Sequence, residues 1–189
     1  MEIENTYSDL RPTLSTERLV LRPFRLSDAT DVQQLAGHPL VYATTATIPH
    51  PYPDGAAEAW ITKHSQWYKD GVGVQFAITS KRDGTLFGCI DLFGISKAHR
   101  RAEIGYWIGV DYWNQGICSE AAKEIVKFGF STLQLNKIVG RHVAHNPNSG
   151  KIMKKIGMQK VGVLKQDFFR NGEYSDIIIY EILRAEYRQ

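Results

Sequence analysis

The chain has 189 residues, of which 43% are hydrophobic and 23% are charged, and its net charge is +3. A chain of this length and composition can bury a core, which excludes a disordered protein, and its only two cysteines, Cys89 and Cys118, exclude a disulfide-rich scaffold. The small charge argues against a nucleic-acid partner, and no apolar run approaches the roughly 20 residues of a membrane helix.

The N-terminal segment is acidic and polar. Residues 1–10 have neither the basic region nor the apolar region of a signal peptide. Two cysteines without a CxxC spacing also fit a reducing compartment. We therefore expect a cytoplasmic protein with one domain over residues 1–189, of which residues 1–15 are an extended lead-in.

The first part of the chain predicts one strand and two helices. Residues 18–22 alternate between apolar and polar side chains, as a strand does. Apolar residues at helical spacing predict a helix capped by Ser27, and then a second helix that Asp54 caps and Gly71 ends. Between the two helices, residues 38–53 are rich in proline, threonine and aromatic residues, which predicts a loop.

The middle of the chain predicts an antiparallel meander. Alternating apolar residues predict strands at residues 74–78, 86–93 and 102–110. An Asp-Gly pair at residues 83–84 is a hairpin turn signal between the first two of them. The second strand is apolar on both faces, so we expect it near the centre of the sheet.

The last part of the chain alternates helices and strands. A long helix is predicted to open at residues 112–116, and a strand follows at residues 137–143. Asn146, Pro147 and Gly157 mark the two ends of a short helix. A closing hairpin is expected from two further strands and the Asn-Gly turn between them, at residues 161–169, 175–183 and 171–172. The whole order predicts a mixed α+β domain.

The predicted strand at residues 102–110 runs through a turn of small residues into the long helix. A helix N-terminus presents unpaired N–H groups and a positive dipole end, so it can bind an anion. Gly116 would let a phosphate approach the backbone, and Asn114 tolerates a left-handed conformation. The turn is neither a P-loop nor a Rossmann fingerprint. Taken alone, it is equally compatible with an ordinary strand-to-helix turn.

Four short motifs occur along this part of the chain in a fixed order. They read EIGYWI at residues 103–108, WNQGICSEA at 113–121, NPNS at 146–149 and KIGM at 155–158. Together with the element order, they resemble the GNAT N-acetyltransferases. The segment TERLVLR at residues 16–22 is similar to the ribosomal-protein N-terminal acetyltransferase (RimJ/RimL-type) branch. The resemblance implies a GNAT fold: a mixed, mostly antiparallel sheet of about seven strands, four flanking helices and a cofactor cleft between two splayed strands.

The same resemblance implies the reaction. The chain would be an N-acetyltransferase that uses acetyl-CoA and acetylates a primary amine, such as the N-terminal α-amine of a ribosomal protein, by direct attack in a ternary complex. Two alternatives stay open: a small amine as acceptor (a polyamine, antibiotic or amino acid), and a CoA-binding module without catalysis. The partner is an amine acceptor rather than nucleic acid or membrane, and the sequence is compatible with a monomer or a homodimer.

The resemblance also implies which residues meet acetyl-CoA: Ile108, Gly109, Val110, Gln115, Gly116, Ile117, Cys118, Ser119, Glu120, Asn146 and Lys154. Lys151 and Lys155 are alternatives to Lys154 for the nucleotide phosphates, and a plain surface role is open for each lysine. Cys118 is expected to be a buried, inert thiol. No metal is expected, because His142 and His145 lack partners at a metal-ligand spacing.

Catalytic groups are expected on the strand and the short helix. Glu103 is the candidate general base, acting through water, with Asp91 as the second choice and a structural carboxylate as the alternative for both. Ser149 resembles the serine that this branch offers as a proton donor to the leaving thiolate, although it could simply cap the helix. Met153 occupies the position at which many GNAT enzymes have a tyrosine that acts as general acid. A backbone N–H near Val110 would hold the oxyanion.

The acceptor amine is expected between two segments that are far apart in the sequence. These are the predicted loop over residues 38–53 and the hairpin over residues 168–174. Four side chains in them are candidates for contact with the acceptor: Tyr42, Tyr52, Phe168 and Glu173.

Overall fold

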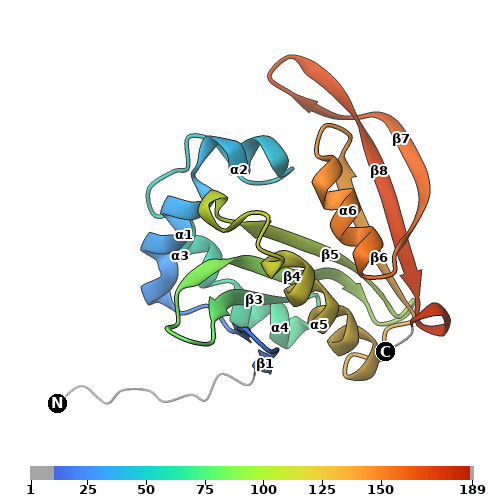
Figure 1. Cartoon of the computed structure of the whole chain (residues 1–189), viewed down its shortest axis with the longest axis horizontal. Helices are drawn as coiled ribbons and strands as arrows, with labels where there is room; N and C mark the ends of the chain where they lie inside the picture. The colour runs from blue at the N-terminus through green and yellow to red at the C-terminus, as the bar shows by residue number, and fades with distance from the viewer. Residues whose placement is uncertain (1–10, 188–189) are drawn as a thin grey trace.

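The computed structural model describes residues 11–187, so most of the predicted lead-in lies outside the described residues. The described chain forms one eight-stranded sheet in the order β1-β2-β3-β4-β5-β6-β8-β7 (Figure 1). Only β5 and β6 pair in parallel, and every other neighbouring pair is antiparallel. The strands are β1 (Leu14–Ser15), β2 (Leu19–Arg22), β3 (Gly73–Ser80), β4 (Leu86–Ser96), β5 (Arg101–Ile108), β6 (Lys137–Val143), β7 (Gln159–Arg170) and β8 (Glu173–Leu183).

Helices cover both faces of this sheet. The α-helices are α1 (Ala29–Ala36), α2 (Pro39–Thr44), α3 (Ala56–Ile61), α4 (His64–Asp70), α5 (Ile117–Ser131) and α6 (Pro147–Lys155). Short 3-10 turns occur at Leu26–Asp28, Val110–Tyr112 and Arg184–Glu186. None of the helices within residues 11–187 is long and apolar enough to cross a membrane.

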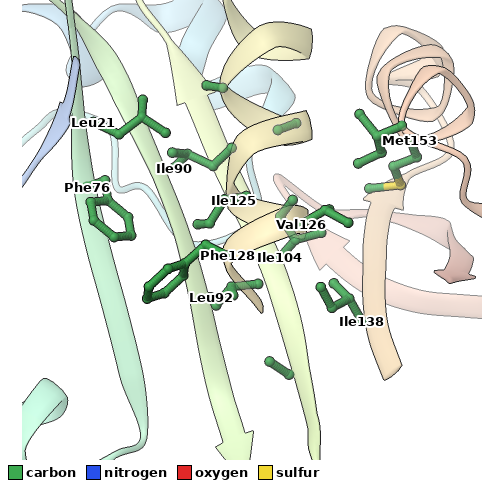
Figure 2. Packing of buried hydrophobic residues seen from close by; sticks show 14 of the residues in the cluster. Leu21, Phe76, Ile90, Leu92, Ile104, Ile125, Val126, Phe128, Ile138 and Met153 are labelled. Atoms are coloured by element: carbon green, nitrogen blue, oxygen red, sulfur yellow. The ribbon is translucent and has the colours of Figure 1, made fainter. Parts of the chain in front are cut away.

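The core has two parts, one on each face of the sheet. Against α5 pack the buried side chains of Phe76, Ile90 and Ile104, which point to one face (Figure 2). Their strand neighbours point to the other face, since side chains alternate along a strand. There Ala77 and Cys89 pack against α1 and α3.

The parallel pair β5 and β6 opens into a V. The two strands pair from Arg101↔Lys137 to Ile104↔Gly140. Beyond this point β5 continues to Ile108 and β6 to Val143 without any described pairing between them. The predicted splayed strands are therefore present, and the unpaired edge of β5 faces the opening.

The predicted α+β class with a mostly antiparallel sheet is confirmed, while the numbers of elements differ from expectation. The sheet has eight strands rather than about seven because Leu14–Ser15 pairs with β2. Residues 11–187 contain six α-helices rather than four. The predicted loop over residues 38–53 contains α2, and the predicted second helix is divided into α3 and α4.

Two predicted helix caps are wrong. The first helix begins at Ala29, after a 3-10 turn, and not at Ser27. Asp28 organises this turn instead: its buried carboxylate accepts two hydrogen bonds from Arg22, at 2.7 and 2.8 Å, and one from the Arg25 backbone at 2.7 Å. These charged contacts keep the pKa of Asp28 low although burial opposes that effect.

Asp54 does not cap the second helix. Its carboxylate accepts a hydrogen bond from Gln33 Nε2 at 2.8 Å and so ties this segment to α1. The N-cap position of α3 is occupied by Gly55 at φ 74°, a conformation that favours glycine. The tertiary contact with α1 therefore replaces the local cap that the sequence predicts.

Candidate active site

A cavity of about 980 Å³ lies at the V between β5 and β6. Its wall includes the start of α5, the first turns of α6 and the end of β5. On the other side of the sheet the same cavity reaches α1, α2 and the segment after α2. One continuous space therefore joins the two faces at the place where the strands part.

The start of α5 faces the cavity, and its backbone there is not capped by a described side chain. Gly116 holds φ 78° at the N-cap. Gly116, Ile117, Cys118 and Ser119 all line the cavity. The first N–H groups of a helix have no acceptor within the helix, and they lie at the positive end of its dipole. This end of the cavity is therefore suited to an anionic group such as a phosphate.

Arg18 lies beside this turn in an ion pair with Glu120. Its Nε atom lies 2.7 Å from Glu120 Oε2, and its Nη1 donates to the Gln115 carbonyl at 3.1 Å. Glu120 also accepts a hydrogen bond from the Thr16 hydroxyl at 2.5 Å. The predicted cofactor residues Gln115 and Glu120 thus hold Arg18 in place through a carbonyl and a carboxylate.

The structure brings only some of the predicted cofactor residues to the main cavity. Ile108, Asn146 and the α5 start line it, whereas Gly109, Val110, Gln115 and Glu120 are outside its wall. Glu120 borders a smaller neighbouring cavity with Gly116, Ser119, Lys123 and Lys155. The Ile108 carbonyl accepts a hydrogen bond from Trp113 Nε1 at 2.7 Å.

The lysines of α6 are not equivalent. Lys151 and Lys155 line the main cavity, four residues apart on one side of the helix. Lys154 is exposed and does not line either cavity. The two lysines that the sequence offered as alternatives therefore line the cavity, whereas Lys154 does not, and Lys155 also borders the smaller cavity with Gly116 and Ser119.

Asn146 acts as the N-cap of α6, as predicted. Its Oδ1 accepts a hydrogen bond from the Ser149 backbone N–H at 3.4 Å. Its Nδ2 donates to the Thr44 carbonyl at 2.9 Å, which joins α6 to the end of α2. This single side chain therefore links the two sides of the cavity.

Ser149 is buried in the first turn of α6 and contacts Tyr106. The two hydroxyl oxygens are 2.8 Å apart, and the Tyr106 hydroxyl also donates to the Ser149 carbonyl at 3.1 Å. Burial raises the pKa of Tyr106, so this hydroxyl keeps its proton. Tyr106 was not predicted as a site residue, although its place two residues before Ile108 on the cleft strand was a usable signal.

Cys118 and Met153 also line the cavity, and Cys118 is half-buried there rather than buried as expected. Burial raises the pKa of Cys118 to about 12, so its thiol is a poor nucleophile at neutral pH. Met153 is fully buried in the core (Figure 2). The position where many related enzymes have a tyrosine is thus used here for packing.

Asp91 and Glu103 lie together on the opposite face of the sheet. Asp91 pairs across β4 and β5 with Gly105, two residues from Glu103, and both carboxylates line the cavity. A Cβ atom at Gly105 would lie 2.4 Å from Asp91 Oδ1, so glycine leaves the room that this carboxylate needs. Side chains alternate along β5, so Tyr106 points toward α6 and Glu103 points toward α1 and α2.

The two carboxylates differ in their charged surroundings. Glu103 Oε2 lies 3.3 Å from Arg141 Nε on β6, and burial raises the Glu103 pKa while the Arg141 and Arg101 charges lower it. Burial raises the pKa of Asp91 to about 7; the negative charge of Glu103 adds to this effect, and the Gly105 backbone hydrogen bond opposes it. The contact of Arg141 with Glu103 could not be predicted from the sequence, because the tertiary structure decides which strand lies parallel to β5.

The predicted acceptor residues divide into two groups. Tyr52 lines the cavity, whereas Tyr42, Phe168 and Glu173 do not. Tyr42 and Phe168 instead enclose the guanidinium of Arg170, which lies 4.2 and 4.7 Å from the two ring centroids. Side chains that the sequence analysis missed complete this end of the cavity: Thr45, Thr47, Trp60, Trp107 and Asp167.

Comparisons with known proteins agree with this architecture. A family model described as an acetyltransferase (GNAT) domain matches residues 18–159. The RimJ protein of Mycobacterium smegmatis, solved in complex with CoA-disulfide, has a TM-score of 0.84 and 22% identity; the match covers 96% of this chain and 91% of that chain. At this identity the structural likeness shows the shared fold.

Three relatives in sequence are also acetyltransferases by name. The Bacillus subtilis protein called Uncharacterized N-acetyltransferase YoaA is 31% identical over 173 residues, which are 92% of this chain and 97% of its own. Spermidine N(1)-acetyltransferase of Escherichia coli K12 is 33% identical over 105 residues, 56% of each chain. Ribosomal-protein-serine acetyltransferase of the same strain is 30% identical over 99 residues, 52% of this chain and 55% of its own.

The resemblance expected from the short motifs is thus confirmed over most of the chain. The family model spans the sheet from β2 to the start of β7, and the YoaA match extends over nearly the whole sequence. The chain therefore belongs to the GNAT acetyltransferase family and is an N-acetyltransferase.

Proposed function

We propose that this enzyme transfers the acetyl group of acetyl-CoA to a protein N-terminal α-amine, such as that of a ribosomal protein, by direct attack in a ternary complex. The observation that carries the proposal is one continuous cavity. The start of α5, which no described side chain caps, lies at one end of it, and the carboxylates of Asp91 and Glu103 lie at the other. The named activity of the ribosomal-protein-serine relative supports this acceptor. The two free cysteines, Cys89 and Cys118, fit action in a reducing cytoplasm.

The residues at the α5 start fit a CoA pyrophosphate. Backbone N–H groups at Ile117, Cys118 and Ser119 would cradle its oxygens, and Gly116 leaves the space for a close approach. Lys151 and Lys155, together with Lys154 on the outer side, would meet the nucleotide phosphates. Toward the V, Asn146 and the backbone of Ile108 would hold the pantetheine arm.

Proton removal is assigned to the acceptor face. An α-amine has a pKa near 8, so only a modest base is needed at neutral pH. Glu103 would accept this proton, through one water, as the nitrogen forms its bond to the acetyl carbon. Arg141 beside Glu103 would orient the carboxylate. Asp91 is the second carboxylate on the same face and the alternative acceptor of the proton.

Proton donation is assigned to the α6 face. When the bond between the acetyl carbon and sulfur breaks, the sulfur leaves with the electron pair and needs one proton or a hydrogen bond. Ser149, in the first turn of α6, would donate this hydrogen bond, and Tyr106 would orient the Ser149 hydroxyl. A thiol has a pKa near 8.5, so the donor assists a leaving group that already departs readily.

A polyamine is the second candidate acceptor. The acceptor end of the cavity wall carries three carboxylates, Asp91, Glu103 and Asp167. Carboxylates gathered at one end of a cavity attract a multiply charged amine. The named activity of the spermidine acetyltransferase relative supports this alternative.

One screen separates these acceptors. Purified enzyme with acetyl-CoA would be mixed with N-terminal peptides of ribosomal proteins, with spermidine and with free amino acids, while thiol release and product mass are recorded. We expect peptides to gain one acetyl group at the α-amine. Preferred acetylation of spermidine would move the acceptor to the second candidate. Tight CoA binding without thiol release on any amine would contradict both and favour a binding module.

A further inference from the structure

The C-terminal end of α2 is held by side chains from the other half of the chain. This helix stands on one side of α6, while the β7–β8 hairpin rises on the other side (Figure 1). The last carbonyls of a helix have no partner within the helix. Here they point toward α6 and β7 and accept hydrogen bonds from three side chains there.

Arg170, at the end of β7, makes one of these contacts and a second one to the segment that follows α2. Its Nη1 donates to the Tyr42 carbonyl at 2.6 Å, and its Nη2 donates to the Ala46 carbonyl at 2.9 Å. The neighbouring carbonyls are engaged from the loop before α6. His145 Nε2 lies 3.0 Å from the Ala43 carbonyl, and Asn146 donates to the Thr44 carbonyl.

The guanidinium of Arg170 is also enclosed by rings. Its Cζ atom lies 4.2 Å from the Tyr42 ring centroid and 4.7 Å from that of Phe168. The Tyr42 hydroxyl in turn donates to Asn171 Oδ1 at 3.2 Å in the hairpin turn. Such a site favours arginine, because lysine lacks the planar face and carries all its donors on a single nitrogen.

This contact fixes one wall of the acceptor end of the cavity. Val41 and the segment from Thr44 to Pro49 line the cavity, and Arg170 itself does not. From the opposite side, Asp167 on the same strand as Arg170 also lines it. Arg170 therefore sets how far the α2 wall stands from β7, without touching the cavity.

We propose that Arg170 is a positioning residue that determines which amine acceptors this enzyme admits. The inference rests on the proposed function, since it concerns the acceptor end of the same cavity. By holding the Thr44–Pro49 wall against the hairpin, Arg170 keeps the acceptor end narrow. Without it, the wall moves outward and acceptors of different shape are bound with similar, weaker affinity.

Arg170→Ala is the test, with Arg170→Lys as the conservative variant. Arg82→Ala is the matched control, because Arg82 is an exposed arginine paired only with Asp83 in a distant turn. In Arg170→Ala we expect the acceptor KM to rise roughly tenfold, as for the loss of one or two hydrogen bonds to backbone. The KM for acetyl-CoA should stay unchanged, and kcat/KM should differ less among acceptors. Arg170→Lys should fall between wild type and Arg170→Ala.

Amide hydrogen exchange over residues 38–49 supplies a readout that needs no turnover. We expect faster exchange in Arg170→Ala than in wild type or Arg82→Ala, with α5 unaffected. If wild type acetylates no amine, the proposed function fails, and exchange still decides whether Arg170 holds the wall. A folded Arg170→Ala with unchanged exchange, or with acceptor KM and selectivity equal to wild type, overturns the inference. An equal loss of affinity for acetyl-CoA and acceptor overturns it too.

Discussion

At one end of the cavity the wall is the start of one long helix, whereas at the other end it is assembled from segments that are far apart in the chain. The α5 start offers backbone N–H groups whose direction follows from the helix itself. The acceptor end combines β4 and β5 carboxylates with the wall after α2 and with β7. The first arrangement depends on local geometry and the second on tertiary contacts.

This difference indicates how each end responds to substitution. A backbone cradle tolerates most side-chain changes and is sensitive where glycine provides the conformation, at Gly116. The acceptor end depends on charges and on contacts such as that of Glu103 with Arg141. Substitutions there should therefore change proton transfer and acceptor choice while leaving CoA affinity in place.

The largest effect is expected at Glu103. Glu103→Gln keeps the size of the side chain but removes its basicity, so the rate at neutral pH should fall by roughly 10²–10⁴ if this carboxylate is the base. Raising the pH should recover much of the loss, because an α-amine with a pKa near 8 then deprotonates without help. Glu124→Gln is the control, because this half-buried carboxylate pairs with the exposed Lys127 on α5 and lines neither cavity. An unchanged pH–rate profile would transfer the role to Asp91 or to bulk water.

The next effect concerns stability and pH at Asp91. Its pKa is raised from 3.8 to about 7, so between these values the folded state holds a proton that the unfolded chain has lost. The free energy of unfolding should therefore decrease as pH rises from about 4 to 7, by at most about 4 kcal/mol. Asp91→Asn should remove this decrease and gain stability relative to wild type at pH 8 but not at pH 4. Denaturant unfolding at both pH values measures the free energy of unfolding of the two proteins. A difference between them that does not depend on pH would contradict the raised pKa of Asp91.

At the cofactor end, Gly116→Val should weaken CoA binding. The φ of 78° strains any residue with a Cβ, and that atom would lie 3.4 Å from Arg18 Nη2, next to the anion site. We expect roughly a tenfold loss of CoA affinity by calorimetry. Gly84→Val is the control, since Gly84 has φ 77° in a turn where a Cβ meets no described atom within 4 Å. Equal CoA affinity in both folded variants would place the cofactor elsewhere.

The smallest effect is expected at Ser149. Ser149→Ala removes a proton donor to a thiolate that leaves readily, so we expect a loss of about tenfold or less, below the range for a required acid. High pH should not restore the rate, in contrast to Glu103→Gln. Tyr106→Phe, which removes the hydroxyl 2.8 Å from Ser149 Oγ, should reproduce part of this loss. A Ser149→Ala enzyme that is rescued by high pH would exclude the assigned role.

Several elements followed from local signals in the sequence. The strand predicted at residues 137–143 is β6 with the same bounds, and Asn146 and Pro147 open α6 as their side chains predict. The Asn-Gly turn at residues 171–172 joins β7 and β8 with positive φ at both positions. Each of these signals acts through a backbone conformation or cap within a few residues, so it needs no tertiary information.

The sequence by itself therefore determined the family, the α+β order of elements and the helix start that faces an anion. Tertiary structure alone decided which side chains meet across the cavity. Arg141 reaches Glu103 only because β5 and β6 pair in parallel, and Arg170 reaches Tyr42 across 128 positions of sequence. Such partners leave no trace in local periodicity, since their contact depends on how the sheet and the loops place two distant segments side by side.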